Sequence, residues 1–325
     1  MIKNFEEIIT LQRGFDLPKQ DRDTGEHPLV SANGISDYIN KYNVSGPGVV
    51  TGRSGTIGNV FYVKNDFWPL NTTLFVKDFH GNNVKYISYW LSRFDLIKYA
   101  NGASVPTLNR NELNGLKCFV HTPSEQQHIV NTIGTVDDLI EKKIQTVNKL
   151  EELSKLLYLK HKNQRDGTLM LGECCDIRTG KLDANAEEKE GKYPFFTCGQ
   201  EIMRINNYAF DCEAIIIAGN GEISVKYYKG KFNAYQRTYV LSPMKHFYLF
   251  LEECKLSIND LKSNSQGSVI KFITKGMLEK IKIVNDKDAS RINQKLGAFY
   301  KEILKLKQQL DSLKKIKTKL LSKYF

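Results

Sequence analysis

Hydrophobic residues recur at helical spacing in two long stretches of the chain. The first stretch runs from Pro123 to His161, and its apolar positions are Ile129, Ile133, Val136, Ile140, Ile144, Val147, Leu150, Leu153 and Leu157. Intervals of three and four residues predict one face of an α-helix, and about 38 residues at 1.5 Å each form a rod of roughly 57 Å. Ser124 and Gln127 have the spacing of a capping box, so we expect this helix to begin there, with Pro123 just outside it.

The second stretch lies near the C-terminus and repeats the pattern. Its apolar positions are Ile292, Leu296, Phe299, Ile303, Leu306, Leu310, Leu313, Ile316 and Leu320. Two rods of similar length in one chain can pair through such faces.

Outside the rods the pattern changes to short β-like runs separated by glycines. VVTGRSGTIGNVFYV (49–63) reads as strand, glycine-rich turn and strand, and AIIIAGNGEISVKYY (214–228) repeats it. GRSGTIG is neither GxGxxG nor a Walker loop, and a strand-like run rather than a helix follows it. We therefore expect no nucleotide cofactor here.

These elements belong to an internal repeat with a period of 166 residues. Gly14 matches Gly180, and Tyr42 matches Tyr208; after Thr72 and Thr238 the register slips, but the order of elements holds. A helix expected over 84–100 corresponds to one over 246–261, and β-like runs over 117–121 and 280–284 precede the rods. The predicted organisation is 1–123 module, 124–163 helix, 164–285 module and 286–325 helix.

The charge of the chain favours an acidic partner. The 325 residues carry a net charge of +11, and residues 164–325 supply most of it, with 28 Lys and Arg against 19 acids. Basic surfaces neutralise phosphates. The alternative is a solvated basic helix, because 301–323 alone contains eight lysines and two acids.

Several classes of protein are disfavoured. No run of about 18 apolar residues and no signal-peptide pattern occurs, which predicts a cytoplasmic protein that does not bind a membrane. The six cysteines form no CxxC pair and the six histidines no HxxxH pair, so we expect neither a metal site nor disulfides.

Polar turns of the two modules provide candidate DNA-binding residues. Arg53 and Ser54 lie in the glycine-rich turn, and Asn220 takes the matching place in the second module; Arg, Asn and Gln can read base edges bidentately. Each turn can equally be purely structural, with surface-exposed charges. The complete set of candidates is Lys19, Arg22, Arg53, Ser54, Asn71, Thr72, Asn109, Arg110, Lys181, Asn220, Gln236 and Arg237.

An ordered set of segments resembles the DNA specificity subunit of type I restriction-modification systems. The segments are LQRGFDLPKQDR, HPLVSANG, GVVTGRSGTIGNV, WPLNTT, VPTLNRNEL and TPSEQQHIV. The resemblance implies an α+β fold with two target recognition domains separated by two long helices, which form an antiparallel coiled coil with a pseudo-two-fold repeat. It also implies that each domain reads half of a bipartite site in double-stranded DNA, and that the chain docks methyltransferase subunits, expected in two copies, and restriction/translocase subunits.

The chain departs from this pattern in one place and lacks the motifs of the catalytic subunits. The second module has no PTLNRN run; Phe272 to Lys275 occupies its place. No Pro-Pro for an amino-methyltransferase motif, no Walker loop and no Pro-Asp for a common nuclease motif occurs, which favours a non-catalytic subunit without a cofactor. The alternatives are a stand-alone nuclease or methyltransferase with an unfamiliar site, and a structural coiled-coil adaptor.

Overall fold

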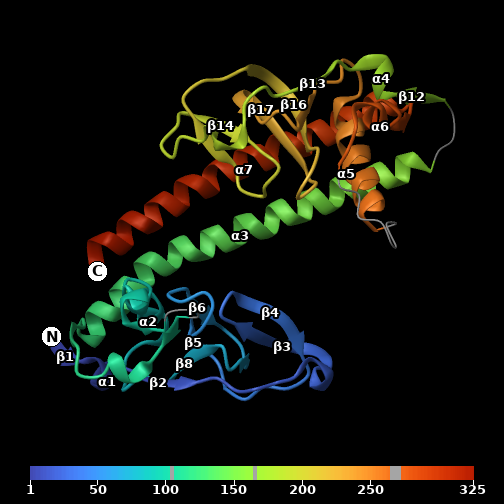
Figure 1. Cartoon of the computed structure of the whole chain (residues 1–325). Helices are drawn as coiled ribbons and strands as arrows, with labels where there is room; N and C mark the ends of the chain where they lie inside the picture. Colours follow the sequence, from blue (N-terminus) through green and yellow to red (C-terminus); the bar gives the residue numbers. More distant parts are fainter. Residues whose placement is uncertain (103–105, 164–166, 264–271) are drawn as a thin grey trace. The chain divides into compact units, whose positions relative to one another are not determined.

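The computed structural model describes residues 1–102, 106–163, 167–263 and 272–325. Contacts divide the chain into two compact units (Figure 1): unit 1 is Met1–Lys142 with Leu310–Phe325, and unit 2 is Lys143–Gln309. Each unit contains one globular module and part of each of two long helices, α3 (Pro123–Lys162) and α7 (Ala289–Tyr324). The predicted α+β fold of two similar modules with two long helices is confirmed. No helix of the described residues is both long and apolar enough to cross a membrane.

The module of unit 1 is built on a four-stranded and a three-stranded sheet (Figure 1). An antiparallel sheet has the strand order β2 (Thr10–Arg13), β8 (Thr73–Asp78), β5 (Gly48–Gly52) and β6 (Val60–Val63). The outer sheet has the order β4 (Gly34–Ile39), β3 (Thr24–Ser31) and β7 (Trp68–Pro69). The smaller elements are β1 (Ile2–Asn4), α1 (Phe5–Ile8), η1 (Lys19–Asp21), α2 (Val84–Leu91), η2 (Leu96–Tyr99), β9 (Ala100–Asn101), β10 (Thr107–Leu108), η3 (Arg110–Glu112) and β11 (Lys117–Phe119).

The module of unit 2 is built on one six-stranded sheet. Its order is β13 (Ile177–Thr179), β18 (Thr238–Leu241), β16 (Phe210–Ala218), β17 (Val225–Ala234), β14 (Tyr193–Phe196) and β15 (Met203–Ile205). Around it lie β12 (Thr168–Met170), α4 (Leu171–Cys174), η4 (Ala184–Ala186), α5 (Phe247–Ser263), α6 (Lys275–Glu279) and β19 (Lys282–Val284). In both modules a strand near the start pairs with one just before the following long helix, β1 with β11 and β12 with β19.

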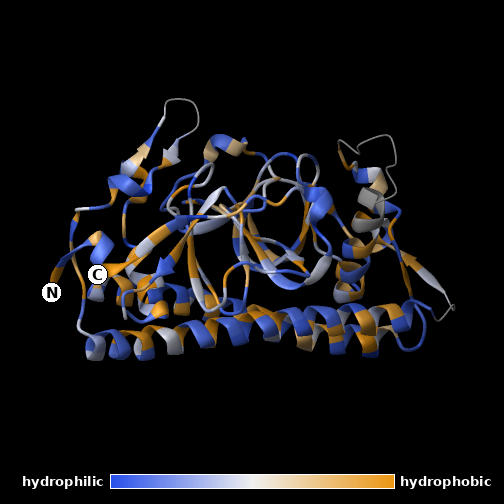
Figure 2. Cartoon of the chain, turned by 90° about the horizontal axis from the view of Figure 1, so that it is seen from below, coloured by the Kyte–Doolittle hydropathy of each residue, from blue (hydrophilic) through white to orange (hydrophobic). Residues whose placement is uncertain are grey.

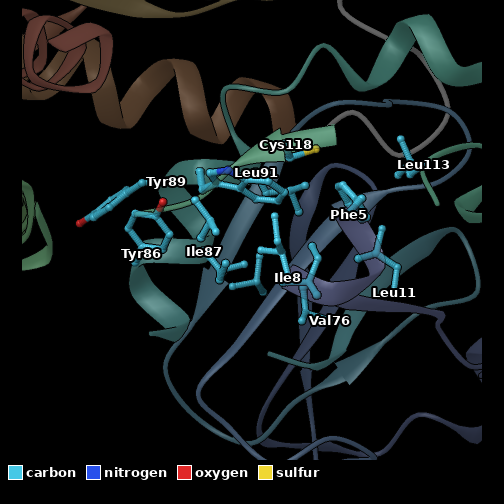
Figure 3. Close-up of a cluster of buried hydrophobic side chains, with 14 of the residues drawn as sticks. Phe5, Ile8, Leu11, Val76, Tyr86, Ile87, Tyr89, Leu91, Leu113 and Cys118 are labelled. Carbon is cyan, nitrogen blue, oxygen red and sulfur yellow. The ribbon is translucent and has the colours of Figure 1, made fainter. Parts of the chain in front are cut away.

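The core of unit 1 gathers side chains from α1, α2, the strands and α3. Phe5 and Ile8 of α1 point toward Tyr86 and Ile87 of α2 across the same cluster (Figure 3), and Ile133 of α3 belongs to it as well. These five side chains are at most 1% exposed. The modules and the long helices differ in the distribution of hydrophobic residues (Figure 2). Hydrophobic residues concentrate on the strands, whereas hydrophobic and hydrophilic residues alternate along a long helix.

The two long helices run antiparallel within each unit. In unit 1, Lys317 Nζ lies 2.6 Å from Asp137 Oδ1. In unit 2, Lys143 Nζ donates to Gln309 Oε1 at 2.7 Å, and the pairing continues where Lys307 Nζ donates to Glu151 Oε1 at 3.0 Å. Residue numbers rise along one helix as they fall along the other, as the resemblance implied.

The start of α3 differs from the sequence prediction. The capping box is formed by Thr122 and Glu125, because Glu125 Oε2 accepts the Thr122 N–H at 2.8 Å and Thr122 Oγ1 accepts the Glu125 N–H at 3.4 Å. Pro123 is the first helical residue, where its missing N–H costs nothing and its fixed φ suits the helix. The prediction from Ser124 and Gln127 was therefore wrong by two residues.

The predicted apolar face of α3 is correct in part. Ile129, Ile133 and Val147 are buried, but Ile144 and Leu153 are 42% and 51% exposed. Beyond Val147, the inner face contains buried polar residues, which are Ser154, Tyr158 and His161. The hydrophobic pattern placed Leu153 and Leu157 on this face, although the buried residues are their neighbours Ser154 and Tyr158. It did so because the residues that face the module there are polar.

The helix predicted over 84–100 is interrupted. α2 ends at Leu91, since the Ser92 hydroxyl donates to Tyr89 O at 2.7 Å and the next N–H groups bond three residues back. The helix predicted over 246–261 is confirmed as α5.

The 166-residue spacing recurs later in the modules, because the two non-glycine residues with positive φ in the described chain are His80 and His246. Before them the spacing is 165, since Thr73 pairs with Gly52 as Thr238 pairs with Ala218, so the predicted match of Thr72 with Thr238 was wrong by one residue.

Candidate nucleic-acid interface

Most candidate loops of unit 1 meet at one end of its antiparallel sheet, where β2 and β5 end and β8 begins. The backbone N–H groups of Arg53 and Ser54 both donate to Thr72 O, at 2.8 and 3.2 Å. Arg53 O accepts the Leu108 N–H at 2.8 Å, and Ser54 forms a bridge with Thr107. Three segments distant in sequence are thus joined through main-chain bonds.

Glycine permits this close approach. A Cβ atom on Gly52 would lie 1.8 Å from Thr56 O, so no larger residue fits where the loop turns back after β5. Gly55 has φ +83° with open space around it. Glycine is therefore required here for its backbone conformation and not for lack of space. The strand, turn and strand prediction for 49–63 is confirmed by β5 and β6.

Three arginines line one hollow of about 420 Å³ at this end of the sheet. Arg53 and Arg110 were candidates, but Arg13, the last residue of β2, was not. Arg110 Nη1 donates to Leu11 O at 3.0 Å. Asn109 caps the turn that carries Arg110, since its Oδ1 accepts the Asn111 N–H at 3.1 Å.

The same end of the sheet in unit 2 has the same main-chain arrangement. Gly219 N donates to Arg237 O at 2.9 Å, and Gly219 O accepts the Ile273 N–H at 2.7 Å. Asn220 forms a bridge with Phe272, and Thr274 Oγ1 caps α6. The run 272–275 therefore occupies the place of 107–110 with different side chains, as the sequence predicted.

Amide side chains in the turns before β8 and β18 are anchored in a similar way. Asn71 Nδ2 donates to Asp16 Oδ1 in unit 1. Gln236 Nε2 donates to Asp183 Oδ1 at 2.7 Å in unit 2. Both side chains are therefore held in place by a partner on the neighbouring loop, and each amide oxygen can still accept a bond. Lys181 is exposed on that loop of unit 2.

Lys19 and Arg22 belong to a different part of unit 1. Their segment packs beside the outer hairpin, because Asn40 N donates to Asp23 O at 3.0 Å. The Arg22 guanidinium donates twice to Leu17 O, at 3.0 and 2.7 Å, so much of its bonding capacity holds its own turn. The structure does not bring these two residues into the group around Arg53.

A lysine that sequence analysis missed lies among the loops of unit 2. Lys226 Nζ donates to Gly199 O at 2.5 Å, and burial lowers the pKa of its ammonium group below the ordinary value. Cys198 beside it donates to Arg237 O at 3.6 Å. In the described part of the chain, no group of three or more His, Cys, Asp or Glu could hold a metal ion, and the cysteines are free.

Comparison with known proteins gives this arrangement a family. The model of the type I restriction modification DNA specificity domain matches residues 1–152 and 168–315. The chain is 39% identical over 155 residues to the type I restriction enzyme EcoDI specificity subunit of Escherichia coli, which covers 46% of this chain and 34% of that protein. It is 27% identical over 131 residues to the EcoprrI specificity subunit of the same species, covering 40% and 31%. These matches span about a third of each relative.

A solved structure shares the fold of the whole chain. The crystal structure of the type I restriction-modification S subunit from M. genitalium superposes with a TM-score of 0.68 at 19% identity, covering 100% of this chain and 96% of that one. At this identity the likeness concerns the fold. Since the family model covers both modules and most of both long helices, the chain belongs to the family of type I restriction modification DNA specificity domains.

Proposed function

We propose that this chain is the non-catalytic DNA specificity subunit of a type I restriction-modification complex, and that each module reads one half of a bipartite target. One observation carries the proposal: the two modules hold different side chains in the same main-chain frame. Arg53 and Arg110 in unit 1 correspond to Gly219 and Lys275 in unit 2. A shared frame with different side chains suits two modules that recognise different base sequences.

Within this frame, Arg53 and Arg237 contact bases. Arg53 extends from a loop whose main chain is bonded on both sides, and Arg237 is exposed in the turn that accepts the Gly219 bond. A guanidinium can donate two bonds to the O6 and N7 atoms of guanine in the major groove. The anchored amides of Asn71 and Gln236 lie in the neighbouring turns.

The long helices provide the docking surface for methyltransferase subunits, expected in two copies, and restriction/translocase subunits join through that complex. Three apolar side chains of α3 support this role because they face solvent: Ile144, Leu153 and Leu156 are 42%, 51% and 54% exposed. Exposed apolar residues of this size on a helix are typical of a surface that another protein covers.

The decisive experiment is methylation mapping of DNA from cells that carry the chain with its methyltransferase subunit. We expect a bipartite motif. Arg53→Ala should relax base preference in one half-site and cost roughly 1–3 kcal/mol of binding free energy there; Arg237→Ala should do the same in the other. Lys98→Ala is the matched control, because Lys98 is exposed and pairs only with Asp95 in its own turn, at 3.1 Å.

Other outcomes would favour the alternatives. Weakening on every DNA sequence alike would make either arginine a phosphate contact. DNA cleavage or methylation by the purified chain alone would support a stand-alone enzyme. Binding no better than that of a generic basic protein, with no methylated motif, would support a structural adaptor.

The length of α3 should set the spacer between the half-sites, because α3 is the covalent link between the modules and runs without interruption through Lys142 and Lys143. Four residues inserted after Gln145 lengthen it by about 6 Å and add about 40° to a full turn. DNA rises about 3.4 Å and turns about 34° per base pair, so the spacer should grow by one or two. The control is the same insertion after Lys189, in an exposed loop. An unchanged spacer in an active variant would contradict the proposal.

A further inference from the structure

The hollow of unit 1 is a preorganised cluster of positive charge. Arg13 ends a strand, Arg53 lies in a loop bonded to two other segments, and Arg110 lies in a turn capped by Asn109 and bonded to the Leu11 carbonyl. None of these positions depends on a flexible terminus. The fold therefore holds the three guanidinium groups close together before any ligand binds.

None of the described residues that line this hollow is a carboxylate. Its polar lining consists of the three arginines together with two asparagines and a threonine. Among the ion pairs of the described residues, none involves Arg13, Arg53 or Arg110. Like charges that gather without an acidic partner attract an anion of matching size.

A second, larger groove of about 830 Å³ adjoins the hollow and shares Arg13 and Arg110 with it. Two acids line this groove against three cations, because Lys77 lies there beside Arg13 and Arg110. Asp16 accepts the Asn71 amide, and Glu6 Oε2 accepts the Gly115 N–H at 2.6 Å, a bond that lowers the pKa of Glu6. Arg13 and Arg110 thus lie where the hollow opens into the groove, at a place that an extended anionic chain could follow.

We propose that Arg13 and Arg110 clamp one phosphodiester of the DNA backbone at the hollow, while Arg53 remains free to contact a base. This inference rests on the proposed function. It adds Arg13 as a contact residue, a phosphodiester as its ligand, and a difference between the two modules. Arginine suits the task because its planar fork donates two parallel bonds to phosphate oxygens. The clamp fixes the register of the module on the duplex without reading sequence.

The clamp belongs to the first module only. Arg13 pairs with Leu74 across β2 and β8, and the corresponding residue is Thr179, which pairs with Tyr239. Arg110 follows the capping residue Asn109, as Lys275 follows Thr274. A threonine and a lysine cannot form the same fork, so the first half-site should contribute more of the salt dependence of binding.

The test uses the full chain in complex with its methyltransferase, bound to a duplex that contains the mapped target. The variants are Arg13→Gln and Arg110→Lys; the latter keeps the charge and tests the fork. Single phosphates of the first half-site are replaced in turn by neutral methylphosphonates. We expect one replacement to weaken wild-type binding, and the same replacement to have little further effect on Arg13→Gln.

The salt dependence gives an independent readout. Arg13→Gln should lower the slope of log K against log salt by about 0.9, which corresponds to a roughly threefold smaller loss of affinity between 50 and 200 mM salt. The methylated motif should stay the same, and Lys98→Gln should change neither quantity. Thr179→Gln in the second module is the positional control and should leave the slope unchanged.

Three results would overturn the inference: an unchanged slope in Arg13→Gln, additive effects of that variant and every methylphosphonate, or a changed motif, which would make Arg13 a base contact. Its failure is distinct from failure of the proposed function. A wild-type complex without any preferred sequence would end the proposed function, yet the slope difference would still be expected on any duplex.

Discussion

The two modules dock a short helix on the long helices by different physical means. In unit 1, α2 presents Tyr86, Ile87 and Leu91, all fully buried, to a cluster that includes Ile129 and Ile133 of α3. In unit 2, α5 presents two buried glutamates. Glu252 accepts a bond from the Tyr300 hydroxyl of α7, and Glu253 from that of Tyr158 of α3.

The start of each short helix shows that the two contacts correspond. Gln126 Oε1 of α3 accepts the Asn83 N–H at 3.0 Å, and Asn293 Oδ1 of α7 accepts the Tyr248 N–H at 2.9 Å. Around this shared bond, the contact in unit 1 is mainly apolar, with a bond from the Tyr89 hydroxyl to Asp137 Oδ2 at 2.6 Å, whereas the contact in unit 2 contains a buried hydrogen-bonded network. The comparison teaches that a duplicated architecture preserves main-chain geometry while the forces that stabilise it change.

The polar contact is sensitive to charge. Burial raises the pKa of Glu252 and lowers that of Lys255, whose Nζ donates to Tyr300 Oη at 2.6 Å. Lys162 Nζ lies 2.8 Å from Glu253 Oε2. A network of this kind stabilises only while every member has its partner, because an unpaired buried polar group costs more than a lost apolar contact of the same area.

The largest effect should come from breaking the apolar contact. Leu91→Ala removes a side chain that is 0% exposed and should lower the free energy of unfolding by about 3 kcal/mol, through lost burial and a residual cavity. Urea denaturation followed by tryptophan fluorescence measures it, since both tryptophans, Trp68 and Trp90, lie in unit 1. Ile97→Ala, at a side chain 64% exposed, is the control and should change stability by less than about 0.5 kcal/mol.

A somewhat smaller effect should follow from breaking the polar contact. Glu253→Ala leaves the buried Tyr158 hydroxyl without its acceptor and should cost about 2 kcal/mol. Because the change lies in unit 2, far-UV circular dichroism should show the loss at lower urea than tryptophan fluorescence does. Coincident curves would show that the units unfold together and that the contrast has no energetic consequence. Glu201→Ala, at an exposed loop residue, is the control.

The smallest effect should be a pH dependence of stability that is larger in unit 2 than in unit 1. Burial raises the pKa of Tyr158 and Tyr300, and raises that of Tyr248 to about 12. Above pH about 10 the unfolded chain releases these protons while the folded chain keeps them, so stability falls as pH rises. Lys255, with its lowered pKa, opposes this trend, and Tyr89 adds a similar term in unit 1.

We therefore expect the thermal midpoint of the dichroism signal to fall between pH 9 and 11 by more than that of the fluorescence signal. Tyr300→Phe removes one of these tyrosines and should reduce the difference between the two midpoints. An equal fall of both midpoints would contradict the assignment of the sensitivity to unit 2.

The sequence predicted those parts of the fold that are encoded locally. Long runs at helical spacing gave α3 and α7, and glycine-flanked runs of β-formers gave β5 and β6. The second half of α3 could not be placed, because its inward-facing residues Ser154 and Tyr158 carry no apolar signal. A tertiary hydrogen bond to Glu253 of α5 makes the position of Tyr158 suitable for burial, whereas Ser154 Oγ is buried without a hydrogen-bond partner among the described residues. No local sequence pattern contains either environment.

The candidate site was predictable to a similar extent. The loops around Arg53, Thr72 and Arg110 were found because polar residues there interrupt strand patterns. Arg13 was missed because it reads as the last polar residue of a strand, and only the pairing of β2 with β8 brings it beside the others. The correspondence of 272–275 with 107–110 was predicted from the order of the segments, and the main-chain bonds of both runs agree with it.

The main-chain bonds of the Arg53 loop also bear on how new DNA targets can arise. Since both backbone groups of residue 53 are bonded and its side chain points into a hollow, substitutions at this position leave the loop in place. Gly219 is closed to such change, because a Cβ atom there would lie 2.5 Å from Arg237 O and 2.9 Å from the Tyr239 ring. Under the proposed function, the first half of the recognition sequence can evolve by single substitutions at this pair of equivalent positions, whereas the second half must change through other residues.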